Sequence, residues 1–117
     1  MGATVRYLLL ICGDEEAHAA MEADGSFLAS CHAWGEELRR RGVLVTVEGL
    51  RPPGDATTVR VRGQEVLLTD GPFADTKEFV GGFVLVECQD LDEALEVASG
   101  HPAARYGAVE IRPLLPT

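Results

Sequence analysis

The hydrophobic and polar positions along the chain follow two kinds of pattern. Short apolar runs bounded by Gly, Pro or Asp are typical of buried strands, whereas apolar residues spaced three and four apart are typical of amphipathic helices. In chain order these patterns predict a strand over 5–12, a helical region over 14–41 with a break at 24–26, a strand over 43–48, a hairpin of 57–62 with 64–69, a single helical turn over 75–78, a strand over 83–88, a helix from 90 to a stop at 100–102, and a strand over 107–114.

Polar residues and glycines mark where the helices start and stop. Asp14 and Asp90 are good N-caps, because a short side-chain oxygen accepts a hydrogen bond from the first helical turn. Gly42 is a typical C-terminal stop, and a Gly-His-Pro sequence ends the second helical pattern. We expect His101, in that sequence, to cap the C-terminal end of its helix.

The predicted order of elements defines the fold class. Without the hairpin the order is βαββαβ, the split βαβ arrangement of ferredoxin-like α+β folds. Residues 57–69 then form a β-hairpin inserted into that arrangement. The chain has 117 residues, which fits a single domain over 1–117 that buries a core without a metal or a disulfide.

The strand pattern predicts a homodimer. Two helices cover only one face of a four-stranded sheet, so the other face should alternate with polar residues if water covers it. The run over 5–12 and the run over 83–88 are instead apolar on both faces. A second copy of the chain is the expected cover for the remaining face, and a hairpin that folds back over the sheet is the alternative.

Charge excludes several classes of partner. The formal net charge is −9, from 19 acidic and 10 basic residues, which argues against a nucleic-acid surface and against an anionic membrane. The one basic run, Arg39-Arg40-Arg41, lies at the end of a predicted helix, where it complements the helix dipole. No apolar run is long enough to span a bilayer.

The three cysteines, Cys12, Cys31 and Cys88, each lie in an apolar segment and form no CxxC pair. A thiol in such a segment behaves as a small hydrophobic group, so we expect reduced, structural cysteines and a cytoplasmic protein. The histidines have no HxH or HxxxH spacing, and no P-loop or GxGxxG sequence is present. We therefore expect neither a metal nor another cofactor.

One block of the sequence resembles a known family. Residues 69–78, Thr-Asp-Gly-Pro-Phe-Ala-Asp-Thr-Lys-Glu, followed by Gly81-Gly82-Phe83, are similar to the DGPF motif block of the YCII-related family, and Glu48-Gly49-Leu50 and the end over 108–113 are similar to that family too. The resemblance implies a dimeric α/β-barrel of ferredoxin-like type. Some members of the family are lyase-like or dehalogenating enzymes with a His–Asp pair, and DGPF members often accompany sigma-factor genes. None of the histidines here matches that pair.

The motif block contains the first set of candidate site residues. Asp70 is either a turn residue whose carboxylate accepts backbone N–H bonds, or a general base or polar anchor at the mouth of a cleft. Lys77, the only lysine, either pairs on the surface with Asp75 or Glu78 or holds an anionic substrate group. Phe73 is expected to line the same site.

The last strand supplies the second set. Glu110 and Arg112 are two residues apart and therefore share one face of that strand, opposite Val109 and Ile111. If these two apolar residues face the helices, the charged pair lies on the dimer face, where Glu48 could join it. Such a group forms either a ligand site or a buried ion-pair network that sets the dimer register.

These residues support two hypotheses of function. The first is a cofactor-free enzyme that performs acid–base chemistry of lyase or isomerase type on a small organic molecule, in a cleft at the dimer face, with Asp70 as base and Lys77 or Arg112 as anion anchor. The second is a non-catalytic binding or regulatory module, in which the acidic surface binds a basic protein partner of a sigma-factor system. A bare structural dimer is the remaining alternative.

Overall fold

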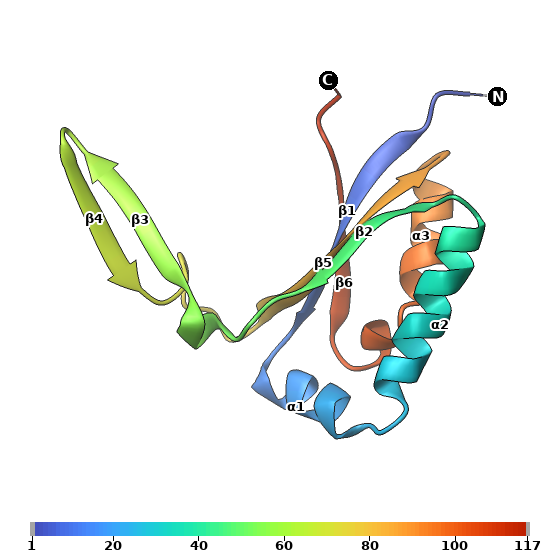
Figure 1. Cartoon of the computed structure of the whole chain (residues 1–117), viewed down its shortest axis with the longest axis horizontal. Helices are drawn as coiled ribbons and strands as arrows, with labels where there is room; N and C mark the ends of the chain where they lie inside the picture. The colour runs from blue at the N-terminus through green and yellow to red at the C-terminus, as the bar shows by residue number, and fades with distance from the viewer. Residues whose placement is uncertain (1, 117) are drawn as a thin grey trace.

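One four-stranded antiparallel sheet carries the helices on a single face (Figure 1). The computed structural model describes residues 2–116. In chain order its elements are β1 (Val5–Gly13), α1 (Glu15–Ala23), α2 (Phe27–Arg40), β2 (Leu44–Gly49), the 3₁₀ turn η1 (Pro53–Asp55), β3 (Thr57–Arg62), β4 (Glu65–Asp70), β5 (Phe79–Cys88), α3 (Leu91–Ser99), the 3₁₀ turn η2 (Pro102–Arg105) and β6 (Ala108–Pro113). The prediction of a mixed α+β chain with an inserted hairpin is confirmed.

The sheet order is β2-β5-β1-β6, so β1 and β5 are the central strands and β2 and β6 are the edges. All neighbouring pairs are antiparallel. In the centre of the sheet Leu9 lies opposite Val84 on β5 and opposite Ile111 on β6. This register places the odd-numbered residues of β1 and β6 and the even-numbered residues of β5 on one face, because side chains alternate along each strand.

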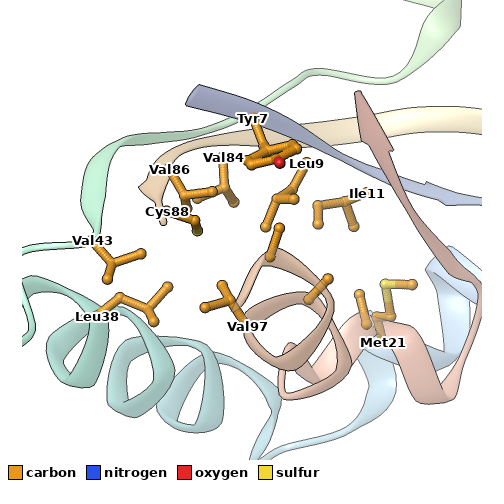
Figure 2. Packing of buried hydrophobic residues seen from close by; sticks show 13 residues of the cluster. Tyr7, Leu9, Ile11, Met21, Leu38, Val43, Val84, Val86, Cys88 and Val97 are labelled. Atoms are coloured by element: carbon orange, nitrogen blue, oxygen red, sulfur yellow. The ribbon is translucent and has the colours of Figure 1, made fainter. Parts of the chain in front are cut away.

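The core lies between the sheet and the helices (Figure 2). Tyr7, Leu9 and Ile11 of β1 face α1 and α3, and the helices contribute Met21, Leu38 and the small residues of α3. Burial of a Val or Leu side chain stabilises the folded chain by about 1.5–3 kcal/mol relative to exposure. The largest fully buried side chains are Leu9, Leu38, Val84, Val86, Cys88 and Val97.

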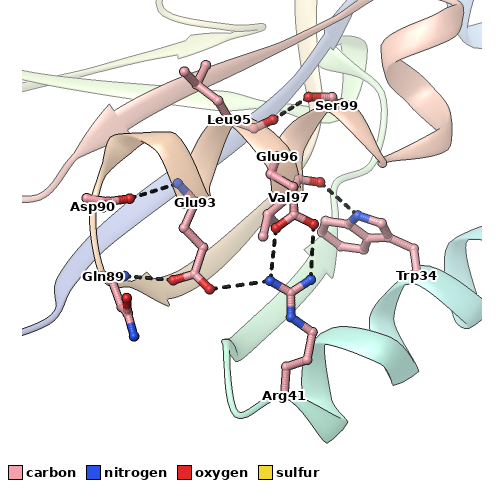
Figure 3. Close-up of polar contacts among 9 residues, drawn as sticks. All are labelled: Trp34, Arg41, Gln89, Asp90, Glu93, Leu95, Glu96, Val97 and Ser99. Atoms are coloured by element: carbon pink, nitrogen blue, oxygen red, sulfur yellow. Dashed lines mark hydrogen bonds and ion pairs between the residues drawn. The ribbon is translucent and has the colours of Figure 1, made fainter. Parts of the chain in front are cut away.

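Polar contacts tie the end of α2 to α3 (Figure 3). The guanidinium group of Arg41 lies 3.0 Å from a carboxylate oxygen of Glu96 and 3.3 Å from one of Glu93. The indole N–H of Trp34 donates to the carbonyl oxygen of Val97 at 3.0 Å. The last residue of the basic run therefore binds the neighbouring helix, in addition to its expected place near the end of α2.

The β3–β4 hairpin, residues 57–70, extends away from the sheet as an arm (Figure 1). The hairpin does not fold back over the sheet, so the alternative of an internal cover is wrong. The radius of gyration is 16.2 Å, compared with about 13 Å for a compact chain of this length. Val59, Val61, Val66 and Leu68 share one side of the arm, and each is more than half exposed.

Two local predictions fail for identifiable reasons. Residues 75–78 form no helical turn, because the Thr76 hydroxyl donates to the carbonyl oxygen of Glu78 and the chain then enters β5 directly at Phe79, earlier than predicted. A register shift between Ile11 and Cys12 accommodates this longer strand. His101 does not cap the C-terminus of α3; its side chain accepts the backbone N–H of Ala103 and so caps the start of η2.

Gly107 is placed where no side chain fits. A Cβ atom there would lie far inside contact distance of the Cys12 carbonyl oxygen, which is backbone and cannot rotate away. We expect Gly107→Ala to lower the free energy of unfolding by about 2 kcal/mol, measured by urea denaturation. Gly35→Ala is the matched control, because a Cβ atom at this helical position meets nothing within 4 Å. It should raise stability by about 0.5–1 kcal/mol, and equal effects of the two changes would contradict the packing.

Candidate functional site

The face of the sheet that carries no helix, which we call the open face, is largely apolar. Leu8 lies opposite Leu85 and Leu10 lies opposite Phe83, so four large apolar side chains are neighbours on the two central strands. All four are only partly buried, although they lie in the middle of the sheet. The prediction that both faces of the central strands are apolar is therefore confirmed.

Charged residues border this apolar centre. Glu110 and Arg112 form an ion pair at 3.2 Å on the edge strand β6, opposite Leu10 and Leu8 respectively. Val109 and Ile111 pack against the core on the helix side of the same strand. Glu110 and Arg112 therefore lie on the open face, as expected if the two apolar residues face the helices. Both charged side chains are more than half exposed in the single chain.

Glu48 lies at the other edge of the sheet. It is opposite Phe83 near the end of β2, and its side chain is exposed. The β2 and β6 edges lie on opposite sides of the two central strands. Glu48 therefore does not join the Glu110–Arg112 pair within one chain.

The motif block forms one wall of a cleft at the base of the arm. This arm-base cleft has a volume of about 590 Å³ and lies between the loop after β2 and the loop before β5. Phe73 is 79% exposed at its rim and has the guanidinium carbon of Arg60 at 5.4 Å from its ring centre. Phe73 therefore adds exposed apolar surface to the wall of the cleft. The walls are formed by residues 50–53, 55–56, 72–76 and 78–80.

Asp70 is the last residue of β4 and precedes the cleft wall, which begins at Pro72, by two positions; neither Asp70 nor Lys77 is among the residues that line the cleft. The turn after it is held by other groups: the Gly71 N–H donates to the Ala56 carbonyl oxygen at 2.7 Å, and the Thr58 hydroxyl donates to the Gly71 carbonyl oxygen at 2.8 Å. Gly71 has a φ of 107°, which explains the glycine. Within residues 2–116 the Asp70 carboxylate accepts no hydrogen bond, so the turn does not use it.

Lys77 is exposed in the loop before β5. Its ammonium group forms no ion pair with Asp75 or Glu78, the surface partners that the sequence offers. Asp70, Phe73 and Lys77 thus belong to the base of the arm, which leaves the body at the β2 and β5 side, whereas Arg112 lies on the opposite edge (Figure 1). A site that contains both sets requires a second copy of the chain.

Sequence reasoning did not identify the role of His18. Its ring stacks on Phe79 with the ring centres 4.4 Å apart, and Nε2 lies 3.3 Å from the Phe79 carbonyl oxygen. A Cβ atom at Gly81 would overlap the His18 ring, so this glycine makes room for the histidine on β5. Histidine and phenylalanine are 61 positions apart, and no local pattern links them.

Residues 2–116 contain no group of three or more His, Cys, Asp or Glu side chains that could hold a metal ion. Among the same residues, every helix is too short or too polar to cross a bilayer. Cys12, Cys31 and Cys88 are all free thiols.

Comparison with known proteins identifies relatives over nearly the whole chain. The model of the YCII-related domain matches residues 5–117. A protein of Rhizobium meliloti (strain 1021), named uncharacterized protein R00369, is 36% identical over 114 residues, which cover 92% of this chain and 90% of the relative.

Proposed function

Since the chain belongs to the YCII-related family, we propose that it is a homodimeric protein that performs cofactor-free acid–base chemistry on a small organic anion. The site lies where the arm-base cleft of one subunit meets the open face of its partner. The observation that carries the proposal is the exposed Asp70 carboxylate, which accepts no hydrogen bond from residues 2–116 and which lies two positions before Pro72 in the wall of an apolar cleft. A carboxylate in such a place is available as a general base.

Two uncovered apolar surfaces support the dimer. The open face presents Leu8, Leu10, Phe83 and Leu85, and one side of the arm presents a row of valine and leucine side chains. An isolated two-stranded hairpin is at best marginally stable in water, so the arm needs a surface to pack on. A second copy provides it, because the arm leaves the body at the edge where the partner's open face would lie.

The strand order supports the finer fold assignment. With the arm set aside, the chain order βαββαβ and the sheet order β2-β5-β1-β6 are those of the ferredoxin-like arrangement. A face-to-face pair of such sheets forms the dimeric α/β-barrel that the family resemblance implies. In that assembly the apolar centres of the two sheets pack together, and the charged edges form the rim.

The chemistry follows from the residues at that rim. Asp70 removes a proton from a carbon or oxygen of the substrate, and Lys77, or Arg112 of the second subunit, holds the anionic group that orients it. Phe73 covers the apolar part of the substrate. Glu110 forms the ion pair with Arg112 on β6 and so restricts the position of its guanidinium group, and Glu48 lines the opposite side of the opening.

Proton transfer can be measured without knowledge of the complete reaction. We expect the protein to accelerate, relative to buffer alone, the exchange in D₂O of the α-protons of one or more β-keto carboxylates or of the γ-protons of one or more α,β-unsaturated carboxylates, followed by ¹H NMR. Asp70→Asn should lower the exchange rate by about 10²–10⁴-fold, because the amide cannot accept the proton. Asp92→Asn, an exposed aspartate on α3, is the matched control and should leave the rate unchanged.

The outcome also discriminates between the two functional classes. An Asp70→Asn protein that retains the full exchange rate and remains dimeric would exclude Asp70 as the base. Absence of exchange with every carboxylate, together with salt-sensitive capture of a basic protein, would favour the non-catalytic module, for which the net charge of −9 is suited.

A further inference from the structure

A second concave surface lies on the helix side of the sheet, away from the open face. This groove has a volume of about 840 Å³ and runs between α1 and α2 on one side and β2 and β5 on the other. Such a volume is within the range of small-molecule sites. Val47 shows how open it is: by register it points to the helix side, opposite Val84, yet it remains 45% exposed. Met21, Phe27, Cys31 and Trp34 contribute the opposite wall.

His101 is a polar group in this apolar groove. Its residue is 7% exposed, and its ring contacts Trp34 edge to face with the ring centres 4.7 Å apart. The Nδ1 atom accepts the N–H of Ala103 at 3.0 Å. Burial lowers the pKa of His101 to about 4, so the ring is neutral at pH 7. With Nδ1 fixed as the acceptor, the single ring proton is on Nε2.

The Nε2–H group of His101 has no hydrogen-bond acceptor within residues 2–116. Within the same residues, no side-chain nitrogen or oxygen that is fully shut off from solvent lacks a partner. The Nε2 atom therefore reaches accessible space, and His101 lines the groove. Water can therefore bind this donor in the groove, and an acceptor group on a bound molecule can take the place of that water.

The mouth of the groove is acidic. Glu22, Asp24 and Glu36 border it, and Arg39, the one arginine or lysine among its lining residues, is paired with Glu36. The Asp24 carboxylate stays ionised, because hydrogen bonds from Tyr106 and Ser26 hold its pKa below the usual value. An anionic ligand would be repelled at this mouth, whereas a neutral or cationic one would enter.

We propose that the groove binds a neutral or cationic apolar molecule, of aromatic size, with a carbonyl or similar hydrogen-bond acceptor at its buried end. The acceptor binds the Nε2–H of His101, the apolar body lies between Val47 and the α2 wall, and any amine lies at the acidic mouth. This site is separate from the acid–base site proposed above, because it uses the helix side of the sheet and the residues of a single chain.

Nile red is a suitable probe, because it is neutral, apolar and carries both a carbonyl oxygen and a tertiary amine. We expect saturable binding of one dye per chain, with enhanced, blue-shifted emission and a change in the fluorescence of Trp34, the only tryptophan. The anionic dye anilinonaphthalene sulfonate should bind at least about tenfold more weakly. In protein labelled with ¹⁵N-histidine, Nile red should shift the Nε2–H signal of His101 and slow its exchange with water.

The β2 strand offers a matched pair of variants. Val45 and Val47 are 43% and 45% exposed on this strand, but only Val47 lines the groove. Val47→Trp should fill the groove and weaken Nile red at least about tenfold, whereas Val45→Trp should change binding less than about twofold. Neither valine belongs to the buried core, so both variants should fold.

Thiol labelling distinguishes the groove from the open face. Cys31 lines the groove, whereas Cys12 lies on the open face opposite Ala108. Nile red should protect Cys31, and not Cys12, from N-ethylmaleimide.

The proposal is overturned if Val47→Trp binds the dye as well as the unchanged protein, if the anionic dye binds equally well, or if Cys12 is the thiol that is protected. The last result would instead place the dye on the open face and would count against a stable dimer there.

Discussion

Leu10→Glu is expected to convert the dimer to separate subunits. Leu10 lies at the centre of the open face, opposite Phe83 on β5 and Glu110 on β6. The interface of the proposed two-fold dimer would then contain two buried carboxylates without partners, one from the substituted position of each subunit. Glu110 lies beside each of them and adds a like charge. The cost of an uncompensated buried charge is several kcal/mol. The dissociation constant should therefore rise by at least about 10³-fold, which corresponds to about 4 kcal/mol.

Sedimentation velocity at micromolar concentration measures this effect. The unchanged protein should sediment as twice its 12.5 kDa chain, and the variant as a single chain or as a mixture that shifts with concentration. Leu91→Glu is the matched control, because Leu91 is 52% exposed in the first turn of α3, where an acidic side chain is favourable. If the unchanged protein is a stable monomer with a wetted open face, or if Leu10→Glu remains a tight dimer, the interface is wrongly placed.

The sequence predicted the sheet well because its signal there is local and redundant. Residue parity in β1 is sufficient to show that Tyr7, Leu9 and Ile11 share one face and that Leu8 and Leu10 share the other. The helix ends were predictable for the same reason, since Asp14 and Asp90 each accept the expected backbone N–H. Periodicity and capping depend only on neighbours within one or two turns.

The failures depend on contacts that no local pattern contains. The composition of the hairpin is compatible both with a position over the sheet and with an extended arm. Only the structure shows that the hairpin extends as an arm (Figure 1). The spacing of Asp75 and Glu78 matches a capping box, but the start of β5 at Phe79 leaves no room for a helical turn. Likewise, the pattern that stops α3 at Gly100 cannot show which backbone N–H the His101 ring will meet.

The candidate site was predictable only in part. The motif block was visible in the sequence, and the structure adds that the turn after Asp70 is held by Gly71 and Thr58 instead of by the aspartate. The separation of Arg112 from Asp70 could not be seen, because it depends on which strands form the edges of the sheet. The groove on the helix side was missed entirely. Its walls come from residues scattered over α1, α2, β2 and β5.

Acid should destabilise the protein through His101 as the pH falls from 6.5 to 4. Burial lowers the pKa of this histidine from 6.5 to about 4 in the folded chain. The unfolded chain therefore binds a proton that the folded chain does not bind between these two values, and stability falls as the pH falls through this window. The expected loss is about 3 kcal/mol between pH 6.5 and 4, at 1.36 kcal/mol for each pKa unit. Above pH 6.5 both states are neutral, so this histidine causes no further change.

Urea unfolding at a series of pH values measures how the free energy of unfolding depends on pH. Ionic strength is kept constant, and protein concentration is kept constant because the stability of a dimer depends on it. His101→Asn removes the titrating ring and retains an oxygen that can accept the Ala103 N–H, so it should flatten the curve between pH 6.5 and 4. His32→Asn is the matched control, because His32 is exposed on α2, and it should leave the slope intact. A curve that remains equally steep in His101→Asn would show that another group binds the proton. The His101 ring would then be less buried than the structure shows, which would count against its place in the wall of the groove.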